Sequence, residues 1–236
     1  MTSALAHANT ALLFYTKRED PRGTVELQLL RAAVFIDLAD ANAASTAISG
    51  LNLERIDNRE QKALYAWRKG DIELLRQQPA AALQWAEQAV DLAAGAHSLG
   101  TEMSARLLKI RALAASGQVA AAQRTLRQTD RLLASNASVP LRLMRLEVAL
   151  LVDPQAARTA YRESLAQLAR LPGWGRAYRL HAAAASALAG SDSTAAATAR
   201  AAALSALTQL RADTPPAQQL ALDAWSKAQP MAGAKP

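Results

Sequence analysis

The sequence predicts an all-α protein built from stacked pairs of antiparallel helices. Alanine makes up about a quarter of the 236 residues and leucine comes next. Both favour helices, because alanine loses no side-chain entropy in a helix and leucine loses little. The residue types that favour strands are sparse and do not cluster in alternating runs. A two-helix unit also recurs along the chain every 35 to 40 residues or so, which is about the period of helix-pair solenoids.

The repeating unit is clearest between Gln61 and Ala93. A first helix carries apolar residues at helical spacing and ends near Gln78. Pro79 follows, and proline is tolerated at the first position of a helix because the N–H that it lacks would have no partner there. A second helix then runs to the end of the unit. This segment therefore predicts one pair of helices joined by a short turn.

Neighbouring segments follow the same plan. Gly117 is expected to end a first helix as a C-cap, and Asp153 is expected to cap the helix that Pro154 opens. The further helices are expected at residues 21–38, 43–51, 103–114, 122–133, 140–151, 154–168, 174–189 and 194–210.

A small residue stands early in each second helix. These residues are Ala44, Ala82, Ala122 and Ala157, with a fifth near Ala195. One helix pair cannot bury its apolar faces alone, so neighbouring pairs stack, and small side chains at fixed places allow their backbones to approach. We therefore expect these alanines to lie at contacts between helices.

The repeats predict a single domain, a right-handed superhelical solenoid of about five pairs. Helices cover its two ends, and Trp85 and Trp225 are expected to pack in its core. The expected parts are a domain over 1–229, with an N-terminal cap over 1–20, repeats over 21–211, a C-terminal cap over 214–229 that covers the exposed end, and a tail over 230–236.

Some of these positions resemble a known family. Gly70 is followed by Ala82, Ala86 and Ala89 in the register of the small residues of the tetratricopeptide repeat family. Gly117 begins a weaker match. The resemblance covers roughly residues 21–210, and the loosened repeats are similar to those of bacterial signalling proteins such as regulatory ATPases, kinases and CHAT-type proteases. It implies an interaction or regulatory module whose first helices line an inner groove.

The sequence contains no pattern typical of a catalytic or metal site. Cysteine is absent, and the three histidines, His7, His97 and His181, belong to different repeats. No phosphate-binding loop, H-E-x-x-H pair or G-x-S-x-G elbow occurs. We therefore expect no catalytic residue, no cofactor and no metal ion, and a protein that is not an enzyme.

The charge pattern indicates what the groove could bind. The net charge is +7 and most basic residues are arginines, which suit carboxylate and phosphate groups through a planar fork of donors. Aromatic residues in the first helices could add apolar anchors. The candidate groove residues are Tyr65, Trp67, Arg68, Arg106, Lys109, Arg142, Arg145, Arg176, Tyr178 and Arg179.

The sequence therefore predicts a scaffold that binds a peptide or helix of another protein, one with an acidic segment, in a mildly basic groove. A basic solenoid that binds nucleic acid is the alternative, and association between copies through an end face stays open. No apolar run is long enough to span a membrane, and no basic segment precedes an apolar stretch at the N-terminus. A cytoplasmic location is expected.

Overall fold

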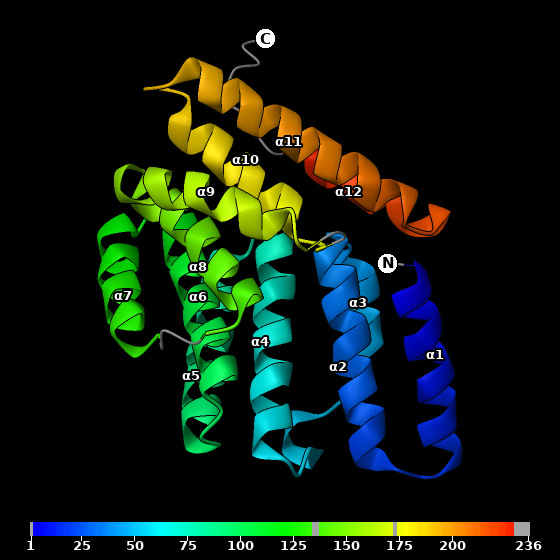
Figure 1. Cartoon of the computed structure of the whole chain (residues 1–236). Helices are drawn as coiled ribbons and strands as arrows, with labels where there is room; N and C mark the ends of the chain where they lie inside the picture. Colours follow the sequence, from blue (N-terminus) through cyan, green and yellow to red (C-terminus); the bar gives the residue numbers. More distant parts are fainter. Residues whose placement is uncertain (1, 134–136, 172–173, 229–236) are drawn as a thin grey trace.

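All regular elements of the described part of the chain are helical, so the all-α prediction is confirmed (Figure 1). The computed structural model describes residues 2–133, 137–171 and 174–228. The predicted tail and the side chain of Trp225 lie outside this part. The helices are α1 (Thr2–Lys17), α2 (Pro21–Asp37), α3 (Ala41–Ile48), α4 (Arg59–Leu75), α5 (Pro79–Gly95), α6 (Leu99–Ala115), α7 (Val119–Leu132), α8 (Val139–Val152), α9 (Pro154–Leu168), α10 (Ala177–Leu188), α11 (Ser193–Ala212) and α12 (Pro216–Ala228), with one 3-10 helix, η1 (Leu53–Arg55).

Aspartate caps set where several helices begin. In each case the carboxylate accepts a backbone N–H of the first turn, a donor that the helix itself leaves without a partner. Asp40 accepts from the backbone of Ala43, so α3 begins two residues before the position predicted from the apolar pattern. The capping residues are Asp20, Asp40, Asp153 and Asp192.

The turns after five helices share a left-handed residue. Glu19, Ala39, Gln77, His97 and Gly117 have φ angles of 54°, 58°, 60°, 56° and 74°. Gly117 confirms the predicted glycine C-cap. The other four carry a Cβ atom in a backbone region that costs roughly 1–2 kcal/mol for an L-residue. The chain therefore uses one turn geometry repeatedly but places glycine in only one of these five turns.

We expect the Ala39→Gly variant to raise the free energy of unfolding by about 0.5–1 kcal/mol. Glycine removes the left-handed penalty, and the greater freedom of the unfolded chain offsets part of the gain. Chemical denaturation measures the difference. As a control, Ala201→Gly in the exposed middle of α11 should lower stability by about 1 kcal/mol, and equal effects of the two variants would contradict the prediction.

The helices pack as a row of pairs. The first helices α2, α4, α6, α8 and α10 lie side by side in succession, and each second helix packs against its own first helix and, in the first four pairs, against the next one as well. The predicted small residues Ala44, Ala82 and Ala122 are fully buried, and Ala157 is nearly so. In the last pair the buried residue is Ala196.

Gly70 marks a close approach of three helices. A Cβ atom at this position would lie 2.5 Å from Leu108 Cδ2 and 3.3 Å from the backbone oxygen of Ala82. Leu108 belongs to α6 and Ala82 to α5, so both neighbours of α4 press on it here. Close helix packing therefore explains why a glycine stands at position 70, one of the positions that carry the family resemblance.

The C-terminal helices lie across the ends of the earlier ones (Figure 1). The sequence predicts that the last helix covers the end of the final repeat. Leu222 of α12 is fully buried in a core that also holds Leu29 of α2, Ile48 of α3 and Tyr178 of α10. The chain thus folds back, and its last helices share a core with the first pair. None of the described helices is both long enough and apolar enough to cross a bilayer.

Candidate functional site

Each first helix contributes one charged residue to a shared cluster. The five residues lie about one repeat apart in the sequence: Asp37, Asp71, Arg111, Glu147 and Arg179. Because the first helices pack side by side, residues at this spacing come together. Arg68 and Arg176 complete the set, which we call the charge cluster.

Two ion pairs form the centre of the charge cluster. Arg111 Nη1 donates to Asp71 Oδ1 at 2.8 Å, and the Asp71 side chain is only 1% exposed. Arg176 Nε lies 3.8 Å from Glu147 Oε2, with both side chains buried. The first pair joins α4 to α6, and the second joins α8 to the residue before α10.

Arg179 connects α10 to the end of α2. Its Nη2 donates to the backbone oxygen of Ile36 at 2.6 Å, and its Nε donates to the Tyr178 hydroxyl at 3.0 Å. That hydroxyl donates to the backbone oxygen of Asp37 at 3.1 Å. A cation is favoured at this place, because the carbonyl groups at a helix C-terminus carry partial negative charge.

Burial and neighbouring charges act against each other in the charge cluster. Burial raises the pKa of Asp37 and outweighs the nearby guanidiniums of Arg176, Arg179 and Arg68, which lower it. Burial lowers the pKa of Arg68 and Arg111. It also acts against the charge of Arg179, but Tyr178, Glu147 and Asp37 together raise the pKa of that group. All four arginines remain cationic, because a guanidinium is not deprotonated in proteins.

The charge cluster stabilises the fold poorly, because removing its charged groups from water costs free energy. Four of its buried polar atoms have no hydrogen-bond partner among the described residues, and these are Arg68 Nε, Asp71 Oδ2, Glu147 Oε2 and Arg176 Nε. The loss of hydration at buried charges often exceeds what their pairing returns, so apolar residues would serve stability at least as well. Groups of this kind, in or beside a cleft, are typical of functional sites.

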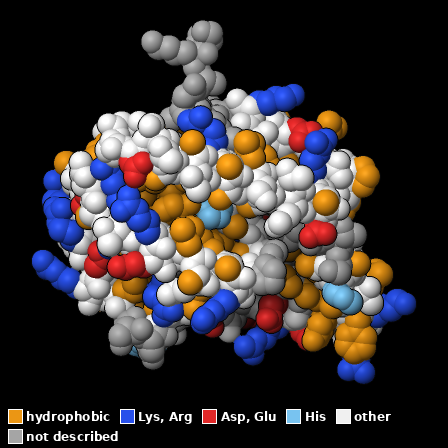
Figure 2. All heavy atoms as spheres, turned by 45° about the horizontal axis from the view of Figure 1, so that its top comes forward, with side chains coloured by type: hydrophobic (Ala, Val, Ile, Leu, Met, Phe, Trp, Pro, Cys, Tyr) orange, Lys and Arg blue, Asp and Glu red, His pale blue; other side chains and the backbone are white. Residues whose placement is uncertain are grey.

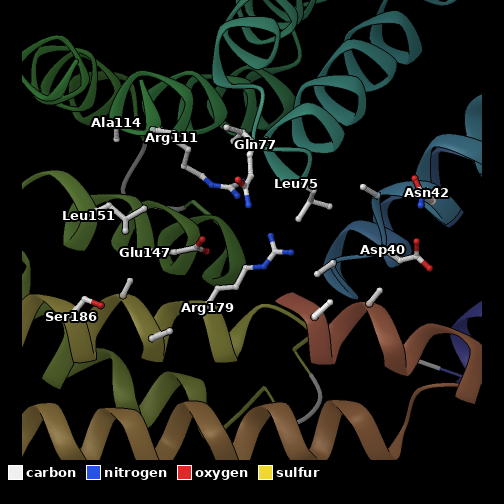
Figure 3. Close-up of a pocket in the computed structure, with 18 residues that line it drawn as sticks. Asp40, Asn42, Leu75, Gln77, Arg111, Ala114, Glu147, Leu151, Arg179 and Ser186 are labelled. Carbon is white, nitrogen blue, oxygen red and sulfur yellow. The ribbon is translucent and has the colours of Figure 1, made fainter. Parts of the chain in front are cut away.

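A cavity of about 730 Å³ opens over the charge cluster. Arg111, Glu147 and Arg179 form its floor, and their charged ends point into the same space (Figure 3). Exposed polar residues such as Asn42, Gln77 and Ser186 lie at the cavity wall. Asp40 adds a carboxylate to the wall. The rest of the wall is apolar and comes from Ala39, Ala41, Leu74, Leu75, Ala114, Ala115, Leu151, Ala182, Ala183, Ala221 and Ala224.

Clefts that bind small ligands have this construction. They usually measure about 300–1,000 Å³ and combine apolar walls with a few convergent polar groups. Among the described residues, no group of three or more histidine or carboxylate side chains is placed to hold a metal ion. The apolar walls and the convergent charged side chains of the cavity are the properties of a binding site for an organic group with a charged end.

The structure brings four of the ten candidate groove residues together at the charge cluster. These are Arg68, Arg176, Tyr178 and Arg179. Of the four, only Arg179 faces the large cavity. Trp67 lies beside them, with the guanidinium of Arg68 3.9 Å from its ring centre, and it lines a second, very small cavity with Arg176 and Glu147.

The other five candidates lie elsewhere. Tyr65 packs edge-on against Trp85, with 6.1 Å between ring centres, so the predicted core role of Trp85 agrees with its packing. The basic residues are engaged locally: Arg106 with Glu102, Lys109 with Glu87, Arg145 with Asp130, and Arg142 with the backbone oxygen of Ala137. None of these five lines the cavity.

Sequence reasoning missed four members of the charge cluster: Asp37, Asp71, Arg111 and Glu147. The signal that could have found them is the recurrence of a charged residue in the first helices at roughly the repeat period. A charge that recurs at the repeat period lies on the same face of each unit, so the stack brings these charges together.

A second polar contact joins α9 to α10, away from the cavity. The Tyr161 hydroxyl lies 2.7 Å from His181 Nδ1, and the two rings meet edge to face at 5.9 Å. Burial raises the pKa of Tyr161 to about 12. Burial also lowers the pKa of His181 below its ordinary value of 6.5. The folded protein therefore favours the neutral imidazole.

We expect acid to destabilise the protein through His181. Its pKa is lower in the folded state, so its contribution is present above pH 6.5 and is lost as the pH falls towards the folded-state value. Between about pH 7.5 and about pH 5, the free energy of unfolding should fall more for the wild type than for His181→Gln, which keeps a hydrogen-bonding group. Chemical denaturation at both pH values measures this, and equal slopes would contradict it.

The surface around the C-terminal helices is mixed in charge. Figure 2 shows basic and acidic side chains interspersed around the edge of this face, with apolar side chains between them. A continuous basic track of the kind that follows a nucleic-acid backbone is not seen on this face. Comparison of the chain with family models, with curated proteins and with solved structures finds no match.

Proposed function

We propose that this chain is a non-enzymatic binding module that holds a short acidic segment of a partner protein in the cavity. The observation that carries the proposal is the floor of the cavity, where Arg111 and Arg179 from two different helices face a space that Glu147, Asp40 and both polar and apolar residues also line. Buried guanidiniums bind carboxylates strongly, because the pairing takes place away from water. Apolar walls then suit the neighbouring side chains of the segment.

The size of the cavity favours an extended segment over a helix. A helix about 10 Å across would fill 730 Å³ within roughly 9 Å of its length, which is only about six residues. A docked helix needs several turns to present its apolar face. The cavity is therefore suited to a few extended residues, and the partner segment is a peptide.

The architecture that we propose is a superhelical stack of the tetratricopeptide kind. The side-by-side first helices and the close contact at Gly70 support it. In such a stack the first helices line the inner face, and the first helices α4, α6, α8 and α10 all contribute residues to the cavity. The partner is another protein, and the scaffold role follows from a rigid site built on several helices.

Selection from a displayed peptide library, with the whole chain as bait, tests the proposal. We expect enriched peptides to carry an acidic residue. We also expect Ser186→Trp to weaken their binding at least tenfold, because an indole at this exposed wall position blocks the cavity without changing the charge cluster. The matched control is Ala201→Trp on the exposed face of α11, which should bind like the wild type.

Two outcomes would contradict the proposal. One is the absence of any enriched peptide that distinguishes Ser186→Trp from the control. The other is capture of nucleic acid with an affinity that falls steeply with salt, because release of counterions produces that dependence. The second outcome would favour the nucleic-acid alternative.

A further inference from the structure

The charges on the floor of the cavity would be balanced by a ligand with one negative charge. Among the described residues, the charge cluster combines four guanidiniums with three carboxylates. The floor has the same balance, with Arg111 and Arg179 against Glu147, and Asp40 adds a second carboxylate at the wall. Asp40 accepts the backbone N–H of Ala43 as the cap of α3, and its negative charge at the wall adds to the repulsion of a dianion. A ligand with one negative charge would therefore neutralise the floor.

Helix ends bring partial charges of both signs to the cavity. The first helices α2, α4 and α6 end there, with Ala39, Leu75 and Ala115 at or near their C-termini. Among the second helices that follow them, α3 begins at the cavity, where Ala41 and Asn42 line the wall. The N-terminus of α3 therefore offsets part of the negative partial charge of the three C-termini.

Glu147 favours a ligand that also carries a hydrogen-bond donor. Its side chain is 4% exposed, and it points into the cavity. Its Oε2 accepts no hydrogen bond among the described residues, and its ion pair with Arg176 is long, at 3.8 Å. Each hydrogen bond that a buried carboxylate accepts offsets part of the cost of its burial, so a ligand that brings an N–H donor to the cavity side of Glu147 would be favoured.

We infer that the cavity binds a carboxylate together with a neighbouring amide N–H, and that it discriminates against phosphate. An acidic residue in an extended peptide presents both groups, because its backbone N–H has no helical partner. The carboxylate meets Arg111 and Arg179, and the N–H meets Glu147. This inference rests on the proposed function and names the group that the site recognises. A phosphate dianion would leave a surplus negative charge beside Glu147.

Four blocked amino acids test the inference by titration into the isotope-labelled chain, followed by NMR. The probes are Ac-Glu-NH₂, its neutral analogue Ac-Gln-NH₂, the form of Ac-Glu-NH₂ that is methylated at the glutamate nitrogen and so lacks the N–H of that residue, and Ac-phosphoserine-NH₂. We expect Ac-Glu-NH₂ to bind at least tenfold tighter than Ac-Gln-NH₂. It should bind about fivefold tighter than its N-methylated form, and tighter than the phosphoserine probe.

The Glu147→Gln variant sharpens the test, because it removes the negative charge from the floor and leaves the shape. We expect it to reverse the order, so that the phosphoserine probe binds tighter than Ac-Glu-NH₂. A purely structural role of Glu147 would not produce this reversal. Glu102→Gln is the matched control, because Glu102 pairs with Arg106 outside the cavity, and it should keep the wild-type order. If the Glu147→Gln variant does not fold, the order of the affinities of the four probes for the wild type decides the test.

The inference is overturned if phosphoserine binds the wild type tighter than glutamate, if N-methylation has no effect, or if Ac-Glu-NH₂ causes no saturable shifts at the cavity. These results test a different claim from the peptide selection, so the two experiments can fail independently. Acidic peptides that bind in the cavity with a different order of probes would leave the proposed function standing and remove this inference. The absence of any cavity-binding peptide would remove the proposed function.

Discussion

The Asp71→Ala variant should lose about 3–5 kcal/mol of unfolding free energy, the largest effect of a single substitution that we expect in this protein. Asp71 is buried and accepts a hydrogen bond from Arg111 at 2.8 Å. Removing the carboxylate leaves the guanidiniums of Arg111 and Arg68 in a desolvated place with less compensation. Chemical denaturation with circular dichroism measures the loss.

A double variant separates the loss of the ion pair from the loss of packing. In Asp71→Leu/Arg111→Met both charges are replaced by apolar groups of similar size, and such replacements are often neutral or stabilising. We expect it to recover most of the stability that Asp71→Ala loses. The argument would be refuted by a double variant no more stable than the single one, or by a loss below about 1 kcal/mol for Asp71→Ala.

The Gly70→Val variant should lower the free energy of unfolding by about 3 kcal/mol, which is at the upper end for overpacked cores. The added Cβ would lie 2.5 Å from Leu108 Cδ2, so α6 or its side chain must move. The backbone oxygen of Ala82, at 3.3 Å, limits movement in the other direction. The effect should be seen in the denaturation midpoint.

Gly100→Val is the control for this substitution. A Cβ atom at Gly100 would meet nothing within 4 Å, and the residue lies in the first turn of α6. We expect a change of less than about 1 kcal/mol there, because only the modest helix preference of valine is involved. Equal losses at the two glycines would show that close helix packing at Gly70 is not the cause.

Local interactions made the helices predictable. Pro79, Asp153 and Gly117 mark helix ends through effects within one turn, and the structure has the expected feature at each. Where the prediction was off by a few residues, a local cap was the reason, as with Asp40 at α3. The small residues Ala44, Ala82 and Ala122 were predictable as well, because stacking at a fixed period requires close contact at the same place in every pair.

The candidate site was predictable only in part. Arg68, Arg176 and Arg179 were expected at the groove and belong to the charge cluster, whereas Arg106 and Arg145 pair with Glu102 and Asp130 away from the cavity. Composition and helical spacing do not distinguish the arginines of the charge cluster from the arginines that lie away from the cavity. The difference between them depends on which face of each helix its neighbours cover.

The sequence by itself determined the helical class, the places where most helices begin and end, and the small residues that allow stacking. Helix propensity, capping and periodicity act over a few residues, so they can be read along the chain. The tertiary structure alone decided which charges are buried and where the cavity lies. Arg179 reaches Ile36, 143 residues away, and Leu222 joins the core of the first pair. Such contacts depend on how helices far apart in the sequence pack together, because the cost of burying a charge is set by neighbours that are distant in sequence.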